Sequence, residues 1–265
     1  MKPFLIVTFI VITLFLIGWL GLQIKPKSFT QPALAQGETK TIPLPAGLPA
    51  PVERFYRTVY GDQIPVIESV VITGRGVMRP FGVWMPARFV IVHRAGYDYR
   101  HYFEVTFFGL PFLKINEGII DGKSFFESPM GTYYDDPNTN QAANLAVWAE
   151  AGWFPAVWLT DPRARWQAVD EQTAILFIPY EYGEESFVVR FNPETGLVDL
   201  MEAMRYKAKG DASKVLWLTN ETQTPDRPRV SYATWLDDGK PWAALTLEEM
   251  RVNLDVSSYL RARGY

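Results

Sequence analysis

The sequence predicts a mainly β protein of the α+β class: a curved antiparallel sheet or half-barrel with a central apolar helix, preceded by one N-terminal transmembrane helix. Three observations predict this fold class. The chain of 265 residues opens with an uncharged apolar run, continues with β-branched and aromatic runs separated by Gly, Pro, Asn and Asp, and contains one strong internal helix candidate. Short runs of this kind between turn residues are typical of successive antiparallel strands.

The apolar run from Phe4 to Ile24 is long enough to cross a membrane. It contains no charged side chain, and as a helix it spans roughly 30 Å, the thickness of a bilayer core. The alternative is a cleaved secretory signal, because a small-x-small pattern ends at Ala35. However, the run is longer than a signal core, and Lys25 and Lys27 lie between it and this cleavage site. We therefore predict a transmembrane anchor over residues 1–24, in a single-pass cell-membrane protein with an extracytoplasmic C-terminal domain.

Composition argues against a nucleic-acid partner and excludes chemistry that requires cysteine. The 26 basic and 29 acidic residues give a net charge of −3 and are spread along the chain. Nucleic-acid backbones attract a basic stripe or patch, so we expect no nucleic-acid partner. Cysteine is absent, which excludes disulfides and an acylated-cysteine anchor. Nothing in the sequence indicates a cofactor, and we expect none.

The rest of the chain divides into a tether and one domain. Residues 25–47 are rich in proline and predict an extended tether, followed by an antiparallel β domain over residues 48–265. The domain opens with a short amphipathic helix that begins near Pro51 and ends near Gly61. The runs that predict strands include "ARFVIVHR", "YDYRHYFEVTFF", "TAILFIPYEY" and "SFVVRF". The segment "LVDLMEAMRY" follows the turn "NPETG", and we interpret it as the return strand of a hairpin.

The internal helix is predicted over residues 138–151, because Asp136-Pro137 can start it and Gly152 can end it. This helix is apolar on most sides, so Glu150 near its end should be buried. An unpaired buried carboxylate is costly. We therefore expect Glu150 to be protonated or held by a cation, with these candidates: Arg163, Arg165 and Arg205. The alternatives are a general acid and a polar anchor at the end of an apolar pocket.

The two histidines of the chain limit nitrogen-based chemistry. If Ala95-Gly96 forms a two-residue turn, His93 pairs with Asp98 and His101 pairs with Val90. The two imidazoles then point to opposite faces of the sheet. The sequence therefore predicts no metal site and no histidine-based catalytic site.

The same hairpin predicts a ligand-binding face. Alternation places several apolar side chains of the two strands on one face, and Trp148 of the internal helix can form an opposing wall. The predicted ligand-binding residues are Val90, Val92, Tyr99, His101, Phe103, Val105, Trp148, Glu150 and Trp153. The alternative is that these residues form a filled core, because protein interiors normally pack without voids.

Four segments resemble, in order and spacing, an uncharacterised bacterial family of unknown function. They are "LPAPVERFYR" (48–57), "EAGWFPAVWL" (150–159), "RWQAVDEQTAIL" (165–176) and "RFNPETGLV" (190–198). The most specific element is Glu150 followed by Trp153-Phe154-Pro155. This resemblance implies no catalytic residue. The order of elements is also similar to that of the half-barrel carriers of the outer-membrane lipoprotein-sorting family, in which a curved sheet surrounds a helix and an apolar cavity.

We weigh three functions. The leading hypothesis is a membrane-anchored, non-catalytic domain that binds a lipid or another apolar ligand. The alternative is a protein–protein interaction domain of a membrane assembly, and the third is a hydrolase that uses Glu150. A carrier requires an internal apolar cavity, whereas an interaction domain should be packed solid and display an outer apolar patch.

Overall fold

The computed structural model describes residues 2–181, 183–206, 210–220, 223–224, 227–228, 231–235 and 240–261. The strands are β1 Thr41–Pro43, β2 Gln63–Pro65, β3 Ser69–Met78, β4 Met85–Arg94, β5 Asp98–Phe107, β6 Leu110–Ile120, β7 Lys123–Ser128, β8 Gly131–Tyr134, β9 Arg165–Ala168, β10 Thr173–Tyr180, β11 Gly183–Phe191, β12 Val198–Arg205, β13 Ser213–Asn220, β14 Gln223–Thr224, β15 Arg227–Pro228, β16 Ser231–Trp235 and β17 Pro241–Val252. The helices are α1 Lys2–Gln23, α2 Ala50–Tyr60, α3 Pro137–Glu150, the 3₁₀ helix η1 Ala151–Trp153 and α4 Val157–Thr160.

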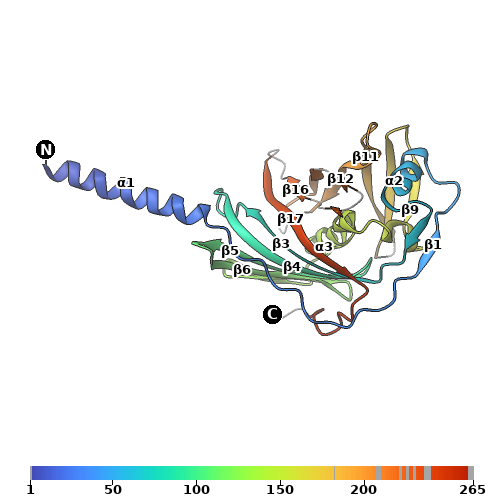
Figure 1. Ribbon diagram of the computed structural model, residues 1–265, viewed down its shortest axis with the longest axis horizontal. Helices are drawn as coiled ribbons and strands as arrows, with labels where there is room; N and C mark the ends of the chain where they lie inside the picture. Colours follow the sequence, from blue (N-terminus) through green and yellow to red (C-terminus); the bar gives the residue numbers. More distant parts are fainter. Residues whose placement is uncertain are drawn as a thin grey trace.

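One antiparallel sheet dominates the domain and curves around α3 (Figure 1). Within the described residues it has thirteen strands, in the spatial order β8-β7-β6-β5-β4-β3-β17-β16-β13-β12-β11-β10-β9. Its two edge strands, β8 and β9, do not pair with each other in this part of the chain, so the sheet does not close into a barrel. The predicted fold class, mainly β with a curved antiparallel sheet, is confirmed.

The sheet consists of two meanders joined by β17 and β16. Strands β3 to β8 form one meander and β9 to β13 the other, and each strand pairs with its neighbour in sequence. β17 pairs with β3 on one side and with β16 on the other, and β16 pairs with β13. β12 returns antiparallel beside β11, as predicted for "LVDLMEAMRY".

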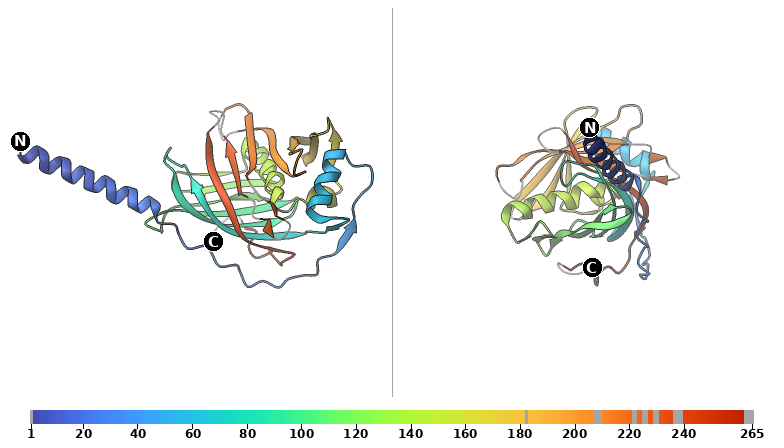
Figure 2. Two further views of the ribbon diagram at one scale, coloured as in Figure 1. Left: turned by 45° about the horizontal axis from the view of Figure 1, so that its top comes forward. Right: turned by 90° about the vertical axis from the view of Figure 1, so that its left-hand side faces the viewer.

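α3 lies inside the curve of the sheet (Figure 2). Its start follows the sequence signal, because the Asp136 side chain accepts hydrogen bonds from the amides of Asn138 and Thr139, and Pro137 occupies the first turn. The helix ends at Glu150 and continues as η1. Most of its side chains are buried, as expected for a helix that is covered on most sides.

The two faces of the sheet pack differently. The concave face, together with α2, α3, η1 and α4, forms the main hydrophobic core. A smaller cluster lies on the convex face. Residues 25–40, which we name the strap, run extended along this convex face. The Gln31 side chain donates to the carbonyl of Val71 at 3.2 Å, and Arg251 donates to the carbonyl of Pro32 at 3.1 Å. The predicted tether therefore contacts the sheet along much of its length.

Candidate functional site

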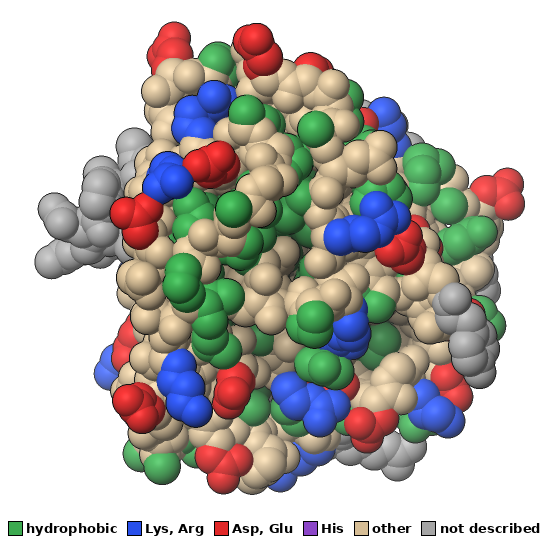
Figure 3. Space-filling view, turned by 90° about the vertical axis from the view of Figure 1, so that its right-hand side faces the viewer, with side chains coloured by type: hydrophobic (Ala, Val, Ile, Leu, Met, Phe, Trp, Pro, Cys, Tyr) green, Lys and Arg blue, Asp and Glu red, His purple; other side chains and the backbone are tan. Residues whose placement is uncertain are grey.

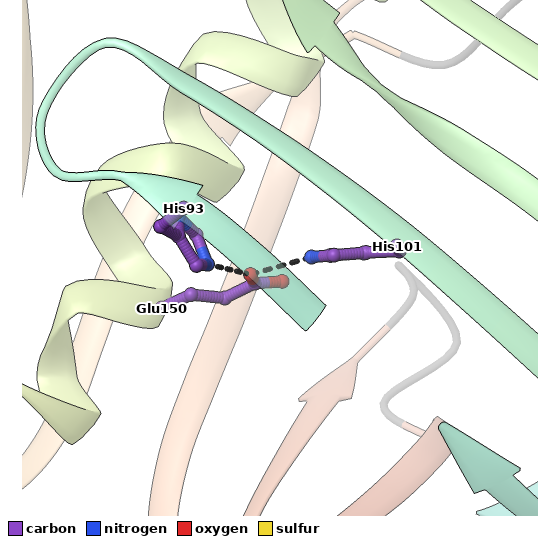
Figure 4. Close-up of side chains that lie close together, drawn as sticks. All are labelled: His93, His101 and Glu150. Atoms are coloured by element: carbon purple, nitrogen blue, oxygen red, sulfur yellow. Dashed lines mark hydrogen bonds and ion pairs between the residues drawn. The ribbon is translucent and has the colours of Figure 1, made fainter. Parts of the chain in front are cut away.

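Two histidines and one glutamate meet between the sheet and α3 (Figure 4). His93 comes from β4, His101 from β5, and Glu150 is the last residue of α3. The Nε2 atoms of His93 and His101 lie 3.0 and 2.6 Å from the same oxygen, Oε2, of Glu150. All three side chains are at most 4 % exposed. The carboxylate therefore sits between two imidazoles, shielded from solvent.

The length of one turn brings the two histidines together. In the β4–β5 ladder His93 pairs with Tyr99 rather than with Asp98, so the turn holds three residues, 95–97. The prediction of a two-residue turn is therefore wrong. A shift of one residue moves a strand's side chains to the other face of the sheet. The prediction that His93 and His101 point to opposite faces is wrong for this reason.

The Trp-Phe-Pro motif that follows Glu150 supports the cluster. The Phe154 ring packs edge-on against the His93 ring, with 5.2 Å between ring centroids. The Tyr56 hydroxyl of α2 donates to the Pro155 carbonyl at 2.7 Å. The most specific part of the sequence resemblance thus packs against His93 of the cluster and is bonded to α2.

Two of the predicted arginine partners of Glu150 pair with other acids, and the third, Arg205, lies near Glu150 in the lining of one small cavity. Arg163 and Arg165 form ion pairs with other acids, at 2.5 and 2.6 Å. Arg205 donates its Nε to the Ala142 carbonyl at 3.2 Å. The expectation that a cation holds Glu150 agrees with the geometry, but the groups that contact its Oε2 are the imidazoles of His93 and His101 rather than the expected arginines.

Burial and hydrogen bonds together set the charges of the cluster. Burial alone would raise the pKa of Glu150, but the charge of His101 and hydrogen bonds from both imidazoles lower it to about 2. Burial would lower the pKa of His101, but Glu150 and Glu117 raise it to about 9. The pKa of His93 is lowered, because burial outweighs the attraction of Glu150. At neutral pH Glu150 is therefore ionised, His101 is protonated and His93 is neutral.

The positions of the protons follow from these charges. An ionised carboxylate can only accept hydrogen bonds, so both Nε2 atoms carry a proton and donate to Glu150. The Nδ1 of His101 lies 3.3 Å from Oε1 of Glu117 and donates to it. The Nδ1 of His93 is buried without a hydrogen-bond partner among the described residues. This fits a neutral ring whose Nδ1 carries the lone pair.

A small cavity adjoins the cluster on the concave side of the sheet. Its volume is about 30 Å³, enough for about two water molecules. Most of the lining side chains are apolar or aromatic: Tyr99, Phe103, Ala146, Trp217, Trp242, Ala243 and Leu245. The remaining four are acidic or basic: His101, Glu117, Glu150 and Arg205. Sequence reasoning missed Glu117, Trp217 and Trp242, whose only signal is their place within strand-like runs.

The predicted ligand-binding residues occupy three different places. Four of them line the cavity: Tyr99, His101, Phe103 and Glu150. Three belong to the main core: Val105, Trp148 and Trp153. Val90 and Val92 lie in the convex cluster. The prediction that these two valines share a face with Tyr99 is therefore wrong, for the same one-residue error in the hairpin.

The two imidazoles and the carboxylate could also hold a metal ion. One ligand atom from each lies within 4.8 Å of the other two, and two histidines with one carboxylate form a known zinc set. At zinc distances of about 2.0–2.1 Å, tetrahedral ligand atoms stand roughly 3.3 Å apart. The N–O distances here are 2.6 and 3.0 Å. The donors therefore fit hydrogen bonding better than metal binding. The expected absence of a metal rested on the wrong register and stays a prediction.

The chain belongs to the family of unknown function DUF6544, whose model matches residues 38–244. This confirms the resemblance to an uncharacterised family, and the match extends beyond the four segments on both sides. No curated protein matches the sequence.

Two solved structures resemble the chain at low identity. A LolA superfamily protein from Nitrosomonas europaea is similar at a TM-score of 0.45 and 10 % identity, over 81 % of this chain and 98 % of that chain. A domain from Vibrio parahaemolyticus, titled as an outer membrane lipoprotein-sorting protein, is similar at a TM-score of 0.39 and 10 % identity, over 69 % and 85 %. Both TM-scores are low, so the fold class rests on the sheet itself.

Proposed function

We propose that this family member is a membrane-anchored, non-catalytic domain that binds a lipid or another apolar ligand against the concave face of its sheet. The composition of the cavity beside α3 carries this proposal. Ligand sites are typically concave and mostly apolar, with a few polar groups that fix orientation. Here Phe103, Trp217 and Leu245 supply apolar walls, while Arg205 and Glu117 supply charge. Such a lining suits an amphipathic molecule with an apolar chain and a polar head.

The cavity must widen to admit such a ligand. A volume of about 30 Å³ accommodates water but no acyl chain. Trp242 is only partly buried and packs at the edge of the main core. We therefore expect a ligand to enter by displacing this indole, which leaves the buried histidine and glutamate cluster in place.

The N-terminal helix supports the membrane anchor. Residues Phe4–Gln23 of α1 have a mean hydropathy of 2.7, and only 6 % of them are buried in the protein. The helix is long and apolar enough to cross a membrane. A signal sequence has the same properties, so the anchor remains part of the proposal.

A catalytic role for Glu150 has less support. A general acid must carry its proton near the working pH, whereas the pKa of Glu150 is lowered to about 2. Its Oε2 atom already accepts hydrogen bonds from the Nε2 atoms of His93 and His101. The small cavity favours a different second candidate, a solidly packed interaction domain in a membrane assembly.

Photo-crosslinking with a diazirine-bearing fatty acid, in membranes that hold the full chain, tests ligand binding. We expect cross-links on cavity-lining peptides, such as residues 213–217, in addition to those on α1. Ala243→Leu enlarges a cavity-lining side chain and should remove the cavity cross-links. The matched control is Ala244→Leu, because Ala244 follows on β17 and faces the other side of the sheet. Thermal unfolding verifies that both variants fold. Cross-links on α1 alone would refute ligand binding and favour the interaction domain.

A further inference from the structure

Two strand connections at the α1 end of the domain expose apolar side chains. The first joins β3 to β4 (residues 79–84), and the second is the β5–β6 turn with the start of β6 (residues 108–112); we name them the two tips. Phe81 in the first tip is 56 % exposed, and Leu110 and Phe112 in the second are 70 and 59 % exposed. The rings of Phe81 and Phe112 lie 6.5 Å apart, so the tips form one apolar patch. Neither tip contains an acidic residue.

The patch lies against the C-terminal end of α1 (Figure 1). The amide of Phe108 donates to the Gly21 carbonyl at 3.0 Å. A Cβ atom on Gly21 would come within 2.6 Å of the Phe108 ring, so glycine permits this close approach. Lys25 and Lys27 follow directly after the helix and are exposed. If α1 spans a bilayer, its last turn and these lysines lie at the lipid headgroups, and the tips lie at the same level.

The backbone of the second tip holds Phe108 in a conformation that is unusual for phenylalanine. Phe108 and Gly109 form a two-residue turn with φ of 53° and 72°, and Asp121 and Gly122 form the same turn at the other end of β6, with 51° and 76°. Such turns favour Asn or Asp at the first position, and a bulky residue with positive φ is strained. The chain therefore uses the favoured residue at one end of β6 and a strained, apolar one beside α1.

The opposite end of the domain has a different surface. Figure 3 views the molecule from the side away from α1, where acidic and basic side chains are scattered among the others. Apolar side chains on that face are interspersed with charges of both signs, whereas the two tips contain no acidic residue.

We propose that the two tips insert into the headgroup region of the bilayer that holds α1, so that a phospholipid surface is their partner. This inference rests on the membrane anchor of the proposed function. The guanidinium of Arg79 lies 5.7 Å from the centre of the Trp84 ring, and both residue types are frequent where proteins meet headgroups. Lys25 and Lys27, which follow α1, are long basic side chains that can reach the headgroups.

This placement also brings the bilayer close to the cavity. The amide of Arg79, the first residue of the first tip, donates to the carbonyl of cavity-lining Trp242 at 2.8 Å. Ala243, which also lines the cavity, pairs with Met78 immediately before that tip. A lipid leaving the bilayer at the tips would therefore meet the partly exposed indole that we expect to move.

Spin labelling tests the insertion of the tips, and the absence of native cysteine allows single labelled sites without background. The full chain is reconstituted in vesicles of phosphatidylethanolamine and phosphatidylglycerol. Separate variants carry a label at Phe112→Cys in the second tip, at Lys123→Cys at the opposite end of β6, and at Phe9→Cys inside α1. Electron paramagnetic resonance then compares the accessibility of each label to oxygen, which concentrates in lipid, and to a polar nickel complex. We expect lipid-like accessibility at positions 9 and 112 and aqueous accessibility at position 123.

A turn variant separates insertion from folding. Phe108→Asp creates the Asp-Gly turn already present at residues 121–122, so it should keep or raise the unfolding midpoint. The same change should shift the label at position 112 towards aqueous accessibility. A label at position 112 that matches position 123, while position 9 reports lipid, would overturn the proposal and leave the anchor intact. An aqueous label at position 9 would overturn both. Lipid-like labels at 9 and 112 without cavity cross-links would support the tips and refute ligand binding.

Discussion

Replacing Glu150 with glutamine should destabilise the fold by about 3 kcal/mol or more. The substitution keeps the shape of the side chain but removes the negative charge that accepts both Nε2 protons. Removing one partner from a buried ion pair typically costs about 3–5 kcal/mol, because the other charge stays buried without compensation. Here the remaining charge is the imidazolium of His101, with only the partly exposed Glu117 beside it.

The pKa of His101 gives an independent measure of the same effect. It is raised to about 9 in the native protein. Without Glu150 the imidazole can release its proton at pH 7, and this forfeits about two pKa units of interaction, or about 3 kcal/mol. In a domain of this size each kcal/mol moves the unfolding midpoint by roughly 2–4 °C, so we expect a fall of roughly 6–12 °C.

Thermal unfolding of the full chain, followed by far-ultraviolet circular dichroism at pH 7, measures this loss. The control is Glu184→Gln, which removes a carboxylate that pairs with Arg165 at an exposed position. Exposed ion pairs contribute little, so this variant should unfold at the wild-type midpoint. If Glu150→Gln also unfolds at the wild-type midpoint, the cluster does not stabilise the fold and the reasoning fails.

Three further predictions concern pH, metal and the membrane. Folding raises the pKa of His101 from 6.5 to about 9, so its contribution to the free energy of unfolding is complete below pH 6.5 and is lost as the pH rises through 9. Folding lowers the pKa of Glu150 from 4.5 to about 2, so its contribution is complete above pH 4.5 and is lost as the pH falls through 2. The difference in unfolding free energy between wild type and Glu150→Gln should therefore be largest between pH 4.5 and 6.5, and urea titrations that show no change with pH would contradict this. Protein purified without added metal should contain no stoichiometric zinc by elemental mass spectrometry; stoichiometric zinc would identify the cluster as a metal site. The full-length chain should stay in the membrane fraction after high-salt and alkaline washes, whereas a soluble chain that begins at Gln36 would identify a cleaved signal.

Elements with strong local signals could be predicted from the sequence. The Asp136 cap and the proline after it start α3 one residue before the predicted position, and the helix ends one residue before the predicted end. The return strand at Val198–Arg205 also follows from a local signal, the turn residues before it. Each of these features depends on residues within a few positions of one another, so it does not require knowledge of the tertiary structure.

The site could not be predicted because it depends on register. A glycine at position 96 suits a two-residue turn and a three-residue turn equally well, since both use positive φ. The two alternatives differ by one residue, yet only the longer turn places His93 on the same face as His101. The partner of Glu150 could not be identified without that register. The sequence then favours an arginine as the partner, because Arg163, Arg165 and Arg205 are the nearest suitable cations in the strands that follow Glu150.

The register that brings the histidines together is also fixed from the convex side of the sheet. Tyr102 lies between His101 and Phe103 in sequence and points away from the cavity, where its ring packs 5.8 Å from the ring of Phe29 in the strap. A slip of β5 by one residue would turn Tyr102 and Glu104 towards the main core and place His101 against the strap. The strap would lose an aromatic contact, and the core would gain an uncompensated carboxylate. Contacts on both faces therefore penalise the same slip, so tertiary packing selects the register that the turn sequence leaves open.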